Sequence, residues 1–337
     1  MLKRLSLAAV VSCVMMGGAL AADPVKVKIG HAGIGIFRLP LYVAIKGGFF
    51  KEEGIEPEVV DTRSGSDADM MLAGGAVDFV TAPLIDNINL NKQGIHAVGV
   101  VALFNRFNNS ITIRKSLAGE IKKFEDMKGR PFGVTGIGSG TWQFALFMAT
   151  VTKMSRDDLN LIAVGTGASM LGAVRAGRVD AMSYADPENN QLVEGGDALF
   201  LVDMTDEATH QKYAGNAALF SHMFTTEAVI KAKPQMVQSY VNAIQRSIVW
   251  LQGRAPEDVA TLIGTYPGFD QVQRPLLIAT VKRSQNAWPK TSVISREAYD
   301  GAMKLPVAIG AIEAAMPFER LVDNSFAEKA AAKYPSK

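Results

Sequence analysis

The glycine-rich run Gly136-Ile137-Gly138-Ser139-Gly140-Thr141 is the part of this chain best suited to binding an anion. It follows an apolar stretch that is typical of a strand and precedes a stretch with helical spacing. Glycines at such a junction let a ligand approach the main chain, and the first N–H groups of the helix point toward it. The run lacks the third glycine of a dinucleotide-binding loop and the Gly-Lys-Ser/Thr of a P-loop. We therefore expect Ser139, Gly140 and Thr141 to contact a small ligand, and the alternative is a tight turn only.

Small hydroxyl side chains, one tyrosine and one aspartate stand at other predicted strand ends and helix starts. In an open α/β sheet, the carboxyl ends of the strands face the crevice in which ligands bind. Tyr184 and Asp186 are expected on one wall of that crevice, opposite a wall lined by hydroxyls. Asp186 either receives a cationic ligand group or caps the helix that follows Pro187. The residues expected at these positions are Ser64, Gly65, Ser66, Thr81, Tyr184 and Asp186.

Two arginines lie in predicted loops that should face the same cleft, Arg38 and Arg106. Either guanidinium group is suited to a two-pronged contact with a carboxylate or a sulfonate, although most arginines in loops are simply solvated. Phe37, Phe107 and Trp142 are candidates for an apolar wall of the cleft. For each of these three, packing in the core is the alternative.

The sequence offers little for catalysis. The 4 histidines are scattered without metal-ligand spacing, and the chain has no Gly-x-Ser-x-Gly elbow. His31, at the end of the first predicted strand, is the one histidine expected near the cleft, and a hydrogen-bonded loop histidine is its alternative. We therefore predict no catalytic residue, no bound metal and no cofactor.

The elements that must position these residues occur twice. Residues 30–35 return as residues 133–138, and the spacing from Gly65 to Asp78 equals that from Gly167 to Asp180. Each copy has an apolar run before its glycine loop and a helical pattern after it. Two such units predict two α/β lobes with mainly parallel sheets flanked by helices, facing each other across a cleft.

The rest of the sequence predicts where the chain crosses between the lobes and where the strands and helices lie. Residues 111–113 are expected to cross to the second lobe and residues 217–220 to cross back, and the chain beyond Thr226 has helical spacing. Among the expected helices are residues 41–50 and 318–326. The expected strands are residues 25–29, 58–60, 77–80, 97–103 and 111–113, followed by residues 131–134, 159–164, 180–184 and 199–202.

The first residues have the pattern of a secretory signal peptide. Lys3 and Arg4 precede an apolar stretch, residues 5–16, that is too short to span a membrane. The small residues that follow predict cleavage after Ala21, with Ala22 as the alternative. The single cysteine, Cys13, follows too little hydrophobic sequence for a lipoprotein box, so we do not expect a lipid anchor.

A mature chain that begins after Ala21 would contain no cysteine, hence no disulfide, thiolate nucleophile or cysteine metal site. Removal of Lys3 and Arg4 lowers the 35 basic residues of the chain to 33, which equals its 33 acidic residues. The mature chain is therefore near neutral, and no basic patch indicates binding to nucleic acid.

Residues 39–44, followed by residues 48–55, resemble the opening of the nitrate/sulfonate/taurine-type substrate-binding proteins of ABC importers, a family that includes thiamine-precursor binders. The resemblance extends in order along essentially the whole mature chain. It continues through Gly65-Ser66, Gly75-Ala76-Val77-Asp78, Asp126-Met127-Lys128-Gly129, Gly177-Arg178-Val179-Asp180-Ala181, and Asn242-Ala243 with Trp250.

The resemblance implies a two-lobed periplasmic binding protein of type II fold, acting as a monomer that delivers its ligand to a permease of the inner membrane. We expect residues 22–112 in lobe 1, residues 113–216 in lobe 2 and residues 217–337 in a return to lobe 1 with C-terminal helices. The family's ligand contacts imply roles for Ile36, Phe37, Ser64, Gly65, Ser66, Thr81, Ser139, Gly140, Thr141, Tyr184 and Asp186.

Two departures narrow the implied function. Where the family often has Trp-Glu-Pro, this chain has Ala185-Asp186-Pro187, which puts aromatic stacking at that position in doubt. The enzymatic branch that makes the thiamine pyrimidine carries a cysteine-rich motif, which the mature chain lacks. We therefore expect a periplasmic binding protein for a small organic anion or zwitterion, such as a sulfonate or a carboxylate. The alternative is an exported enzyme or a ligand sensor on the same scaffold.

Overall fold

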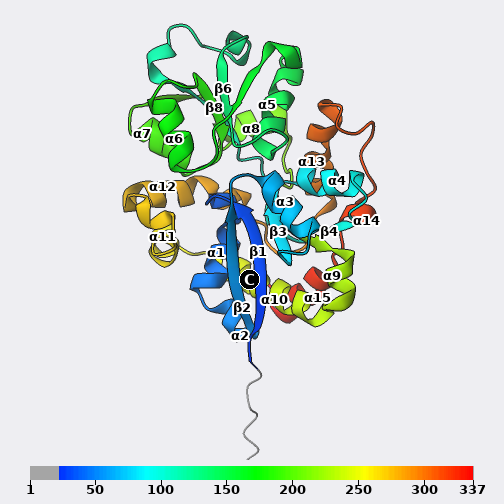
Figure 1. Ribbon diagram of the computed structural model, residues 1–337. Coiled ribbons are helices and arrows are strands. Elements are labelled where there is room, and N and C mark those ends of the chain that lie inside the picture. Colours follow the sequence, from blue (N-terminus) through cyan, green and yellow to red (C-terminus); the bar gives the residue numbers. More distant parts are fainter. Residues whose placement is uncertain (1–22, 337) are drawn as a thin grey trace, which may run out of the picture.

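The computed structural model describes residues 23–336, which form two lobes that are each built on a five-stranded sheet (Figure 1). The predicted signal peptide and Cys13 lie outside the described residues. The strands of lobe 1 lie in the order β2-β1-β3-β10-β4, and those of lobe 2 in the order β7-β6-β8-β5-β9. Their bounds are β1 Val25–Ala32, β2 Ile55–Thr62, β3 Phe79–Ala82, β4 Ala97–Phe104, β5 Ser110–Arg114, β6 Pro131–Val134, β7 Asn160–Ala163, β8 Ala181–Tyr184, β9 Ala198–Val202 and β10 Ser221–Thr226.

Each sheet contains one strand that runs against its two neighbours. In lobe 1 this is β10, which pairs antiparallel with β3 and β4, and in lobe 2 it is β5, which pairs antiparallel with β8 and β9. The other strands of each sheet point the same way, so the prediction of a two-lobed α/β fold with mainly parallel sheets is confirmed. Parallel sheets covered on both faces place the carboxyl ends of their strands at one edge.

The helices pack on the faces of the two sheets and between the lobes (Figure 1). Helix α13 contacts α4 of lobe 1 and α5 of lobe 2, and α12 contacts α7 of lobe 2. None of the helices in residues 23–336 has both the length and the apolarity that a membrane span needs. The bounds are α1 Leu39–Lys46, α2 Phe49–Glu52, α3 Gly65–Ala73, α4 Leu84–Lys92, α5 Gly140–Val151, α6 Ala168–Arg175, α7 Glu188–Glu194, α8 Glu207–Tyr213, α9 Glu227–Ala232, α10 Pro234–Leu251, α11 Pro256–Ile263, α12 Arg274–Ser284, α13 Arg296–Ala308, α14 Phe318–Leu321 and α15 Ser325–Lys333.

Two expected helices are each divided in the structure. The helix expected over residues 41–50 is interrupted between α1 and α2, because Gly48 adopts the left-handed conformation with φ of 77°. The helix expected over residues 318–326 is interrupted between α14 and α15. There, Val322 is extended and forms a parallel bridge with Gly99 of β4. The tertiary contact with the edge of the sheet overrides the helical spacing at this point.

The two segments that cross between the lobes run side by side. The main-chain N–H groups of Ala218 and Phe220 donate to the carbonyl oxygens of Asn105 and Phe104, each over 2.9 Å. Residues 217–220 precede β10, which begins at Ser221, and lie where the return crossing was expected. The outward crossing lies between β4 and β5, whereas residues 111–113, which were expected to cross, belong to β5 in the sheet of lobe 2. These paired crossings form the hinge between the lobes.

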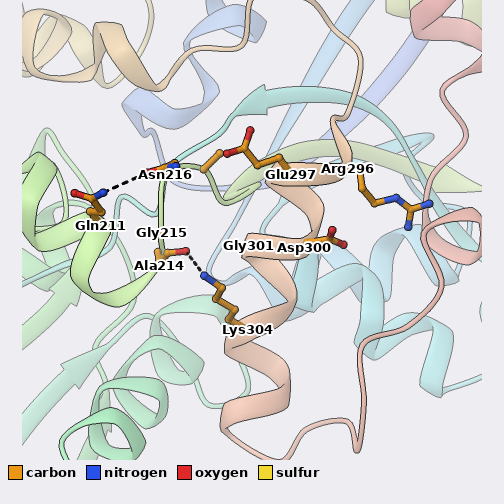
Figure 2. Close-up of a pocket in the computed structure, with 10 residues that line it drawn as sticks. Gln211, Ala214, Gly215, Asn216, Arg296, Glu297, Asp300, Gly301 and Lys304 are labelled. Atoms are coloured by element: carbon orange, nitrogen blue, oxygen red, sulfur yellow. Dashed lines mark hydrogen bonds between the residues drawn. The ribbon is translucent and has the colours of Figure 1, made fainter.

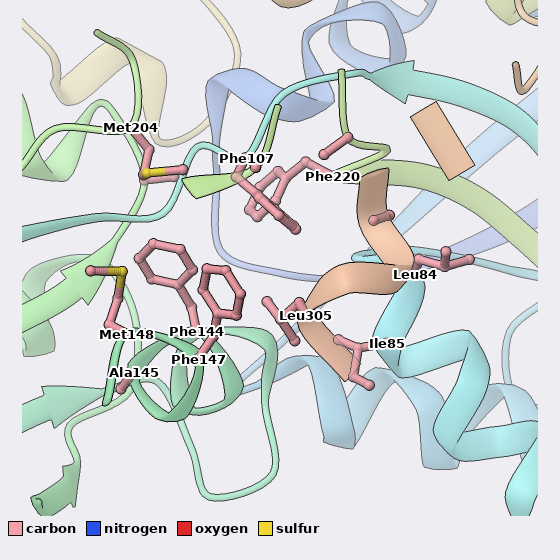
Figure 3. Close-up of a cluster of buried hydrophobic side chains, with 14 of the residues drawn as sticks. Leu84, Ile85, Phe107, Phe144, Ala145, Phe147, Met148, Met204, Phe220 and Leu305 are labelled. Atoms are coloured by element: carbon pink, nitrogen blue, oxygen red, sulfur yellow. The ribbon is translucent and has the colours of Figure 1, made fainter. Parts of the chain in front are cut away.

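An aromatic cluster joins the two lobes beside the hinge (Figure 3). Phe107 and Phe220 come from the crossing segments, and their rings meet edge to face at 6.0 Å. Phe144 and Phe147 come from α5 of lobe 2, and both rings lie within 6.4 Å of the Phe107 ring. Phe107 therefore takes the role of a core residue, which was the alternative to its role as a cleft wall.

A surface groove of about 660 Å³ lies beside the return crossing, between the end of α8 and helix α13 (Figure 2). Lys304 of α13 donates to the carbonyl oxygen of Ala214 over 3.1 Å. Gly301 of α13 lies so close to the crossing that a Cβ atom added there would be 1.9 Å from the carbonyl oxygen of Ala217. The absence of a side chain at Gly301 therefore allows α13 to support the hinge.

We predict that Gly301→Ala destabilises the protein, although Gly to Ala in a helix ordinarily stabilises by about 0.5–1 kcal/mol. The added methyl group must displace α13 or the crossing segment, at a cost of about 1–3 kcal/mol. Urea unfolding measures the change. Gly172→Ala in α6 is the matched control, because no atom lies within 4 Å of its added Cβ, and this variant should gain stability. Equal gains in both variants would contradict the close contact.

Candidate ligand-binding cleft

A small cavity lies between the lobes, where the carboxyl ends of β1 and β3 face the amino end of α5. Its volume is about 40 Å³, which is room for a few water molecules in this closed arrangement. A larger ligand therefore requires the lobes to separate. The cavity is lined by both lobes, through Ala32, Phe37, Arg38, Gly65, Ala82, Pro83, Asp86, Asn109, Thr135, Ser139, Gly140, Thr141, Tyr184 and Phe220.

The lobe 2 wall contains three buried hydroxyl groups at the start of α5, those of Thr135, Ser139 and Thr141, here called the hydroxyl cluster. The Thr135 hydroxyl donates to Ser139 Oγ over 2.9 Å, and Ser139 Oγ donates to the Gly136 carbonyl over 2.7 Å. Thr141 Oγ1 accepts from the Thr135 main-chain N–H over 2.9 Å. This network holds the expected glycine-rich loop at the amino end of a helix, a position that favours an anionic or hydrogen-bond-accepting group.

The lobe 1 wall contains a buried arginine, Arg38, which is the last residue of a 3-10 turn after β1. Its Nη1 donates to the carbonyl oxygens of Ala32 and Gly33 over 3.3 and 3.2 Å, and its Nη2 donates to that of Thr81 over 3.4 Å. The guanidinium group therefore joins the ends of β1 and β3. In this structure, both Nη atoms of Arg38 donate to main-chain carbonyls, and the predicted contact of Arg38 with a carboxylate or a sulfonate stays a prediction. Phe37 lies beneath the guanidinium group, 4.3 Å from its carbon to the ring centroid.

Asp86 of α4 is a cavity residue that we did not predict from the sequence. Its exposed fraction is 1%, and neither carboxylate oxygen has a hydrogen-bond partner in the described part of the chain. Burial raises the pKa of Asp86 to about 7, and the positive charge of Arg38 opposes this rise. The available signal was an acidic residue among Leu84, Ile85 and Ile88, on the apolar face of a helix that directly follows a strand end.

Tyr184 and Asp186 lie where the two lobes touch. The Tyr184 hydroxyl is 2.9 Å from the position of a Cβ at Gly33, so any side chain there would push the lobes apart. Gly33 also has a φ of 61°, which favours glycine. The main-chain N–H of Ile36 donates to the carbonyl oxygen of Asp186 over 3.2 Å. The Ile36 side chain itself packs in the core of lobe 1.

The Asp186 carboxylate faces helix α12. Arg283 of α12 places its Nε 3.6 Å from Asp186 Oδ2 and its Nη2 2.9 Å from Asp203 Oδ2. On the same helix, the Thr280 hydroxyl accepts a hydrogen bond from the Asn190 amide over 3.0 Å. We call these contacts of Arg283 and Thr280 the α12 latch, because they join α12 to lobe 2.

The two glycine loops meet across the lobes, as the repeat indicated. A Cβ added at Gly136 would lie 3.1 Å from the Cβ of Ser64, and one at Gly138 would lie 3.8 Å from Ser66 Oγ. Ser64 is also the N-cap of α3, where its Oγ accepts from the Asp67 N–H over 3.2 Å. The Ser64 and Ser66 side chains therefore border the contact between the lobes without lining the cavity.

Thr81 and Arg106, both predicted at the cleft, lie elsewhere. The Thr81 hydroxyl is buried within lobe 1, 3.2 Å from the Ser221 hydroxyl. Arg106 forms an ion pair with Glu207 over 3.5 Å at a separate surface pocket near the hinge. Trp142 is half-buried and lies beneath the guanidinium group of Arg156, 4.9 Å from the ring centroid. Arg106 was predicted from its position in a loop, and that position does not specify which way the loop faces.

His31 is buried and uncharged. Burial and the positive charge of Arg38 lower the pKa of His31 to about 3. Its ring lies edge-on to Tyr42, with 6.1 Å between ring centroids, and its Nδ1 is 3.5 Å from Asp61 Oδ1. Within residues 23–336, histidine and acidic side chains do not gather in any group that could hold a metal ion.

We predict that Arg283→Met weakens the closed arrangement by about 1–2 kcal/mol, because the variant leaves the carboxylates of Asp186 and Asp203 without their shared partner. Small-angle scattering should show a larger radius of gyration for the variant than for the wild type. Lys282→Met, at the exposed neighbouring position of α12, is the matched control and should leave it unchanged. An unchanged radius in both variants would show that the α12 latch does not hold the lobes together.

We also predict that Glu188→Gln gains stability over the wild type as the pH rises. Burial, with repulsion from Asp186, raises the pKa of Glu188 to about 8, so the wild type loses stability as the pH climbs from the unfolded pKa near 4.5 through 8. The difference should grow by up to about 1.4 kcal/mol per pH unit. Urea unfolding at pH 5, 6.5 and 8 measures it, with the exposed Glu194→Gln on the same helix as control. A difference that does not vary with pH would contradict a buried, protonated Glu188.

The chain is similar to solved structures along nearly its whole length. A structure from Bordetella bronchiseptica RB50 has 25% identity, covers 93% of this chain and 99% of that chain, and gives a TM-score of 0.84. The alkanesulfonate-binding protein SsuA from Xanthomonas axonopodis pv. citri, bound to MOPS, has 16% identity, covers 92% of this chain and 98% of that chain, and gives a TM-score of 0.69. The second likeness shows a shared fold.

Similar sequences include both a binding protein and an enzyme. YtlA of Bacillus subtilis (strain 168), which carries the name of a binding protein, is 20% identical over 309 residues, 90% of this chain and 89% of YtlA. The 4-amino-5-hydroxymethyl-2-methylpyrimidine phosphate synthase of Aspergillus parasiticus is 25% identical over 223 residues, 63% of this chain and 62% of the synthase. The model of the "NMT1/THI5 like" family matches residues 38–257, and the chain therefore belongs to this family.

Proposed function

We propose that this chain is the periplasmic solute-binding component of an ABC importer, and that it binds a small organic anion or zwitterion between its lobes. The observation that carries the proposal is the cavity itself, which both lobes line. The Thr141 hydroxyl and the main-chain N–H groups at the amino end of α5 supply donors from lobe 2. Arg38 and Asp86 supply charge from lobe 1.

The similar proteins support this function. The two-lobed fold is shared with binding proteins, among them the alkanesulfonate-binding SsuA. The N-terminal segment with a predicted cleavage after Ala21 fits delivery to the periplasm. In this proposal the protein acts as a monomer and passes its ligand to a permease of the inner membrane.

Closure around the ligand follows from a cavity with two walls. A ligand that contacts both lobes binds the closed arrangement more tightly than the open one, and it shifts the population accordingly. The closed arrangement already has contacts of its own, at Gly33 with Tyr184 and in the α12 latch. Because the cavity is only about 40 Å³, the lobes must part to admit a ligand and then close around it less completely than in this arrangement. A permease that favours the open form would release the ligand.

An enzyme on the same scaffold is the second candidate, and the similarity to the pyrimidine phosphate synthase favours it. The residue of this chain that best supported an enzyme was His31. That histidine packs against Tyr42 with a neutral ring and is not among the residues that line the cavity. Binding without conversion of the ligand is therefore the function that the geometry supports best.

The test is calorimetry of the mature protein with sulfonates, taurine, nitrate, carboxylates and thiamine precursors. At 100 times its dissociation constant, a true ligand should raise the free energy of unfolding by about 2.7 kcal/mol. The ligand recovered after incubation should be chemically unchanged, and a product would favour the enzyme instead. No binding across the panel would contradict the proposed function.

A variant of Thr141 tests whether the ligand binds in the cleft, at the amino end of α5. Thr141→Val removes one hydroxyl of the hydroxyl cluster at nearly constant volume, and affinity should fall about tenfold because a hydrogen bond to a charged group is lost. Thr150→Val, at the exposed far end of α5, is the matched control and should bind as the wild type does. Equal affinity in both variants would move the ligand away from the amino end of α5.

A further inference from the structure

We propose that Asp86 binds a cationic nitrogen of the ligand, so that the ligand is a zwitterion whose cationic end lies on lobe 1 and whose anionic end lies on lobe 2. The inference rests on the proposed function and names the ligand class within it. It starts from a carboxylate that the fold buries beside the cavity and leaves without a hydrogen-bond donor.

The fold places Asp86 at the cavity through the junction of β3 and α4. Pro83 follows β3 and precedes α4, and Asp86 lies in the first turn of that helix. Both residues line the cavity. Asp86 has an exposed fraction of only 1% and no hydrogen bond to either oxygen within residues 23–336. A buried carboxylate without donors is costly, so its presence at a cavity calls for a donor from outside the chain.

The neighbouring groups leave Asp86 open to such a donor. Arg38 affects its charge, but the Nη1 and Nη2 atoms of Arg38 donate to main-chain carbonyls, and no ion pair joins the two side chains. Asp86 Oδ2 lies 2.9 Å from the position of a Cβ at Gly65, so the carboxylate borders a residue without a side chain. Gly65 also lines the cavity.

A second acidic residue, Asp69 of α3, lies near Asp86. Burial and repulsion from Asp86 raise the pKa of Asp69 well above its usual range. Two carboxyls that share one proton are the alternative explanation for this pair. That arrangement needs no ligand, and it predicts no preference for cationic compounds.

The opposite wall suits the other end of a zwitterion. The amino end of α5 and the hydroxyl cluster lie on lobe 2 and line the same cavity as Asp86. The dipole of a helix favours a negative group at this end. A molecule with an ammonium group and a sulfonate or carboxylate a few bonds apart therefore contacts both lobes at once. A plain anion satisfies only one of the two walls.

The experiment compares compounds that differ only in the cationic group. Taurine is paired with isethionate, and β-alanine with 3-hydroxypropionate, so that each pair exchanges an ammonium for a hydroxyl. Ethanolamine tests the ammonium without the anion. By calorimetry, the wild type should prefer the ammonium member of each binding pair at least tenfold, because a charge-assisted hydrogen bond is lost otherwise. Ethanolamine should bind more weakly than taurine.

The variant Asp86→Asn should reduce the preference within each pair to about threefold or less, because a neutral amide lacks the charge that selects the ammonium. Asp67→Asn removes one negative charge from α3, which packs against α4 in lobe 1, and should keep the wild-type preference. Thermal melting checks that both variants fold. If Asp86→Asn fails to fold, the wild-type ratios still decide the ligand class.

Each outcome has a distinct meaning. Isethionate binding as tightly as taurine, or ethanolamine binding more tightly than taurine, would overturn the zwitterion while the proposed function stands. A preference that survives in Asp86→Asn would overturn the role of Asp86. No binding by any compound of this set or of the wider panel would contradict the proposed function itself, and this inference with it.

Discussion

The cleft depends on the hydrogen bonds that the buried guanidinium group of Arg38 donates to main-chain carbonyls of lobe 1. A charge with an exposed fraction of 3% persists only if polar groups compensate it, and here the carbonyl oxygens of Ala32, Gly33 and Thr81 do so. The three carbonyls belong to the ends of β1 and β3 or to the loop that follows. Arg38 therefore holds together the edge of lobe 1 at which the cavity forms.

The same charge sets the protonation of its surroundings. It adds to burial in keeping His31 uncharged, and it opposes the effect of burial on Asp86, Tyr184 and Glu188. The cavity thus has a guanidinium group whose Nη1 and Nη2 atoms are hydrogen-bonded and an acidic side chain, Asp86, whose oxygens are not. This difference between the two charged groups is the basis of the ligand preference proposed for the lobe 1 wall.

The residues that we predicted at the site from the sequence differ in how close they lie to the cavity. Ser139, Gly140, Thr141 and Gly65 lie beside the cavity, because the topology of a parallel sheet brings strand ends and helix starts to one edge. Ser64, Ser66 and Thr81 lie at the same edge but do not line the cavity, because the direction of each side chain depends on its own packing. Arg106 was placed wrongly, because the direction of a loop depends on the helix that packs beside it. Glu207 of α8 pairs with Arg106, about a hundred residues later in the chain.

The sequence by itself determined the two-lobed α/β architecture, since alternating apolar runs, glycine loops and helical spacings depend only on neighbouring residues. It also determined that a glycine-rich loop would open α5. Only the tertiary structure decided which charges meet. Asp186 faces Arg283 and Asp86 borders Gly65 because helices α12, α4 and α3 pack where they do. Such pairings join distant segments, and local spacing carries no information about them.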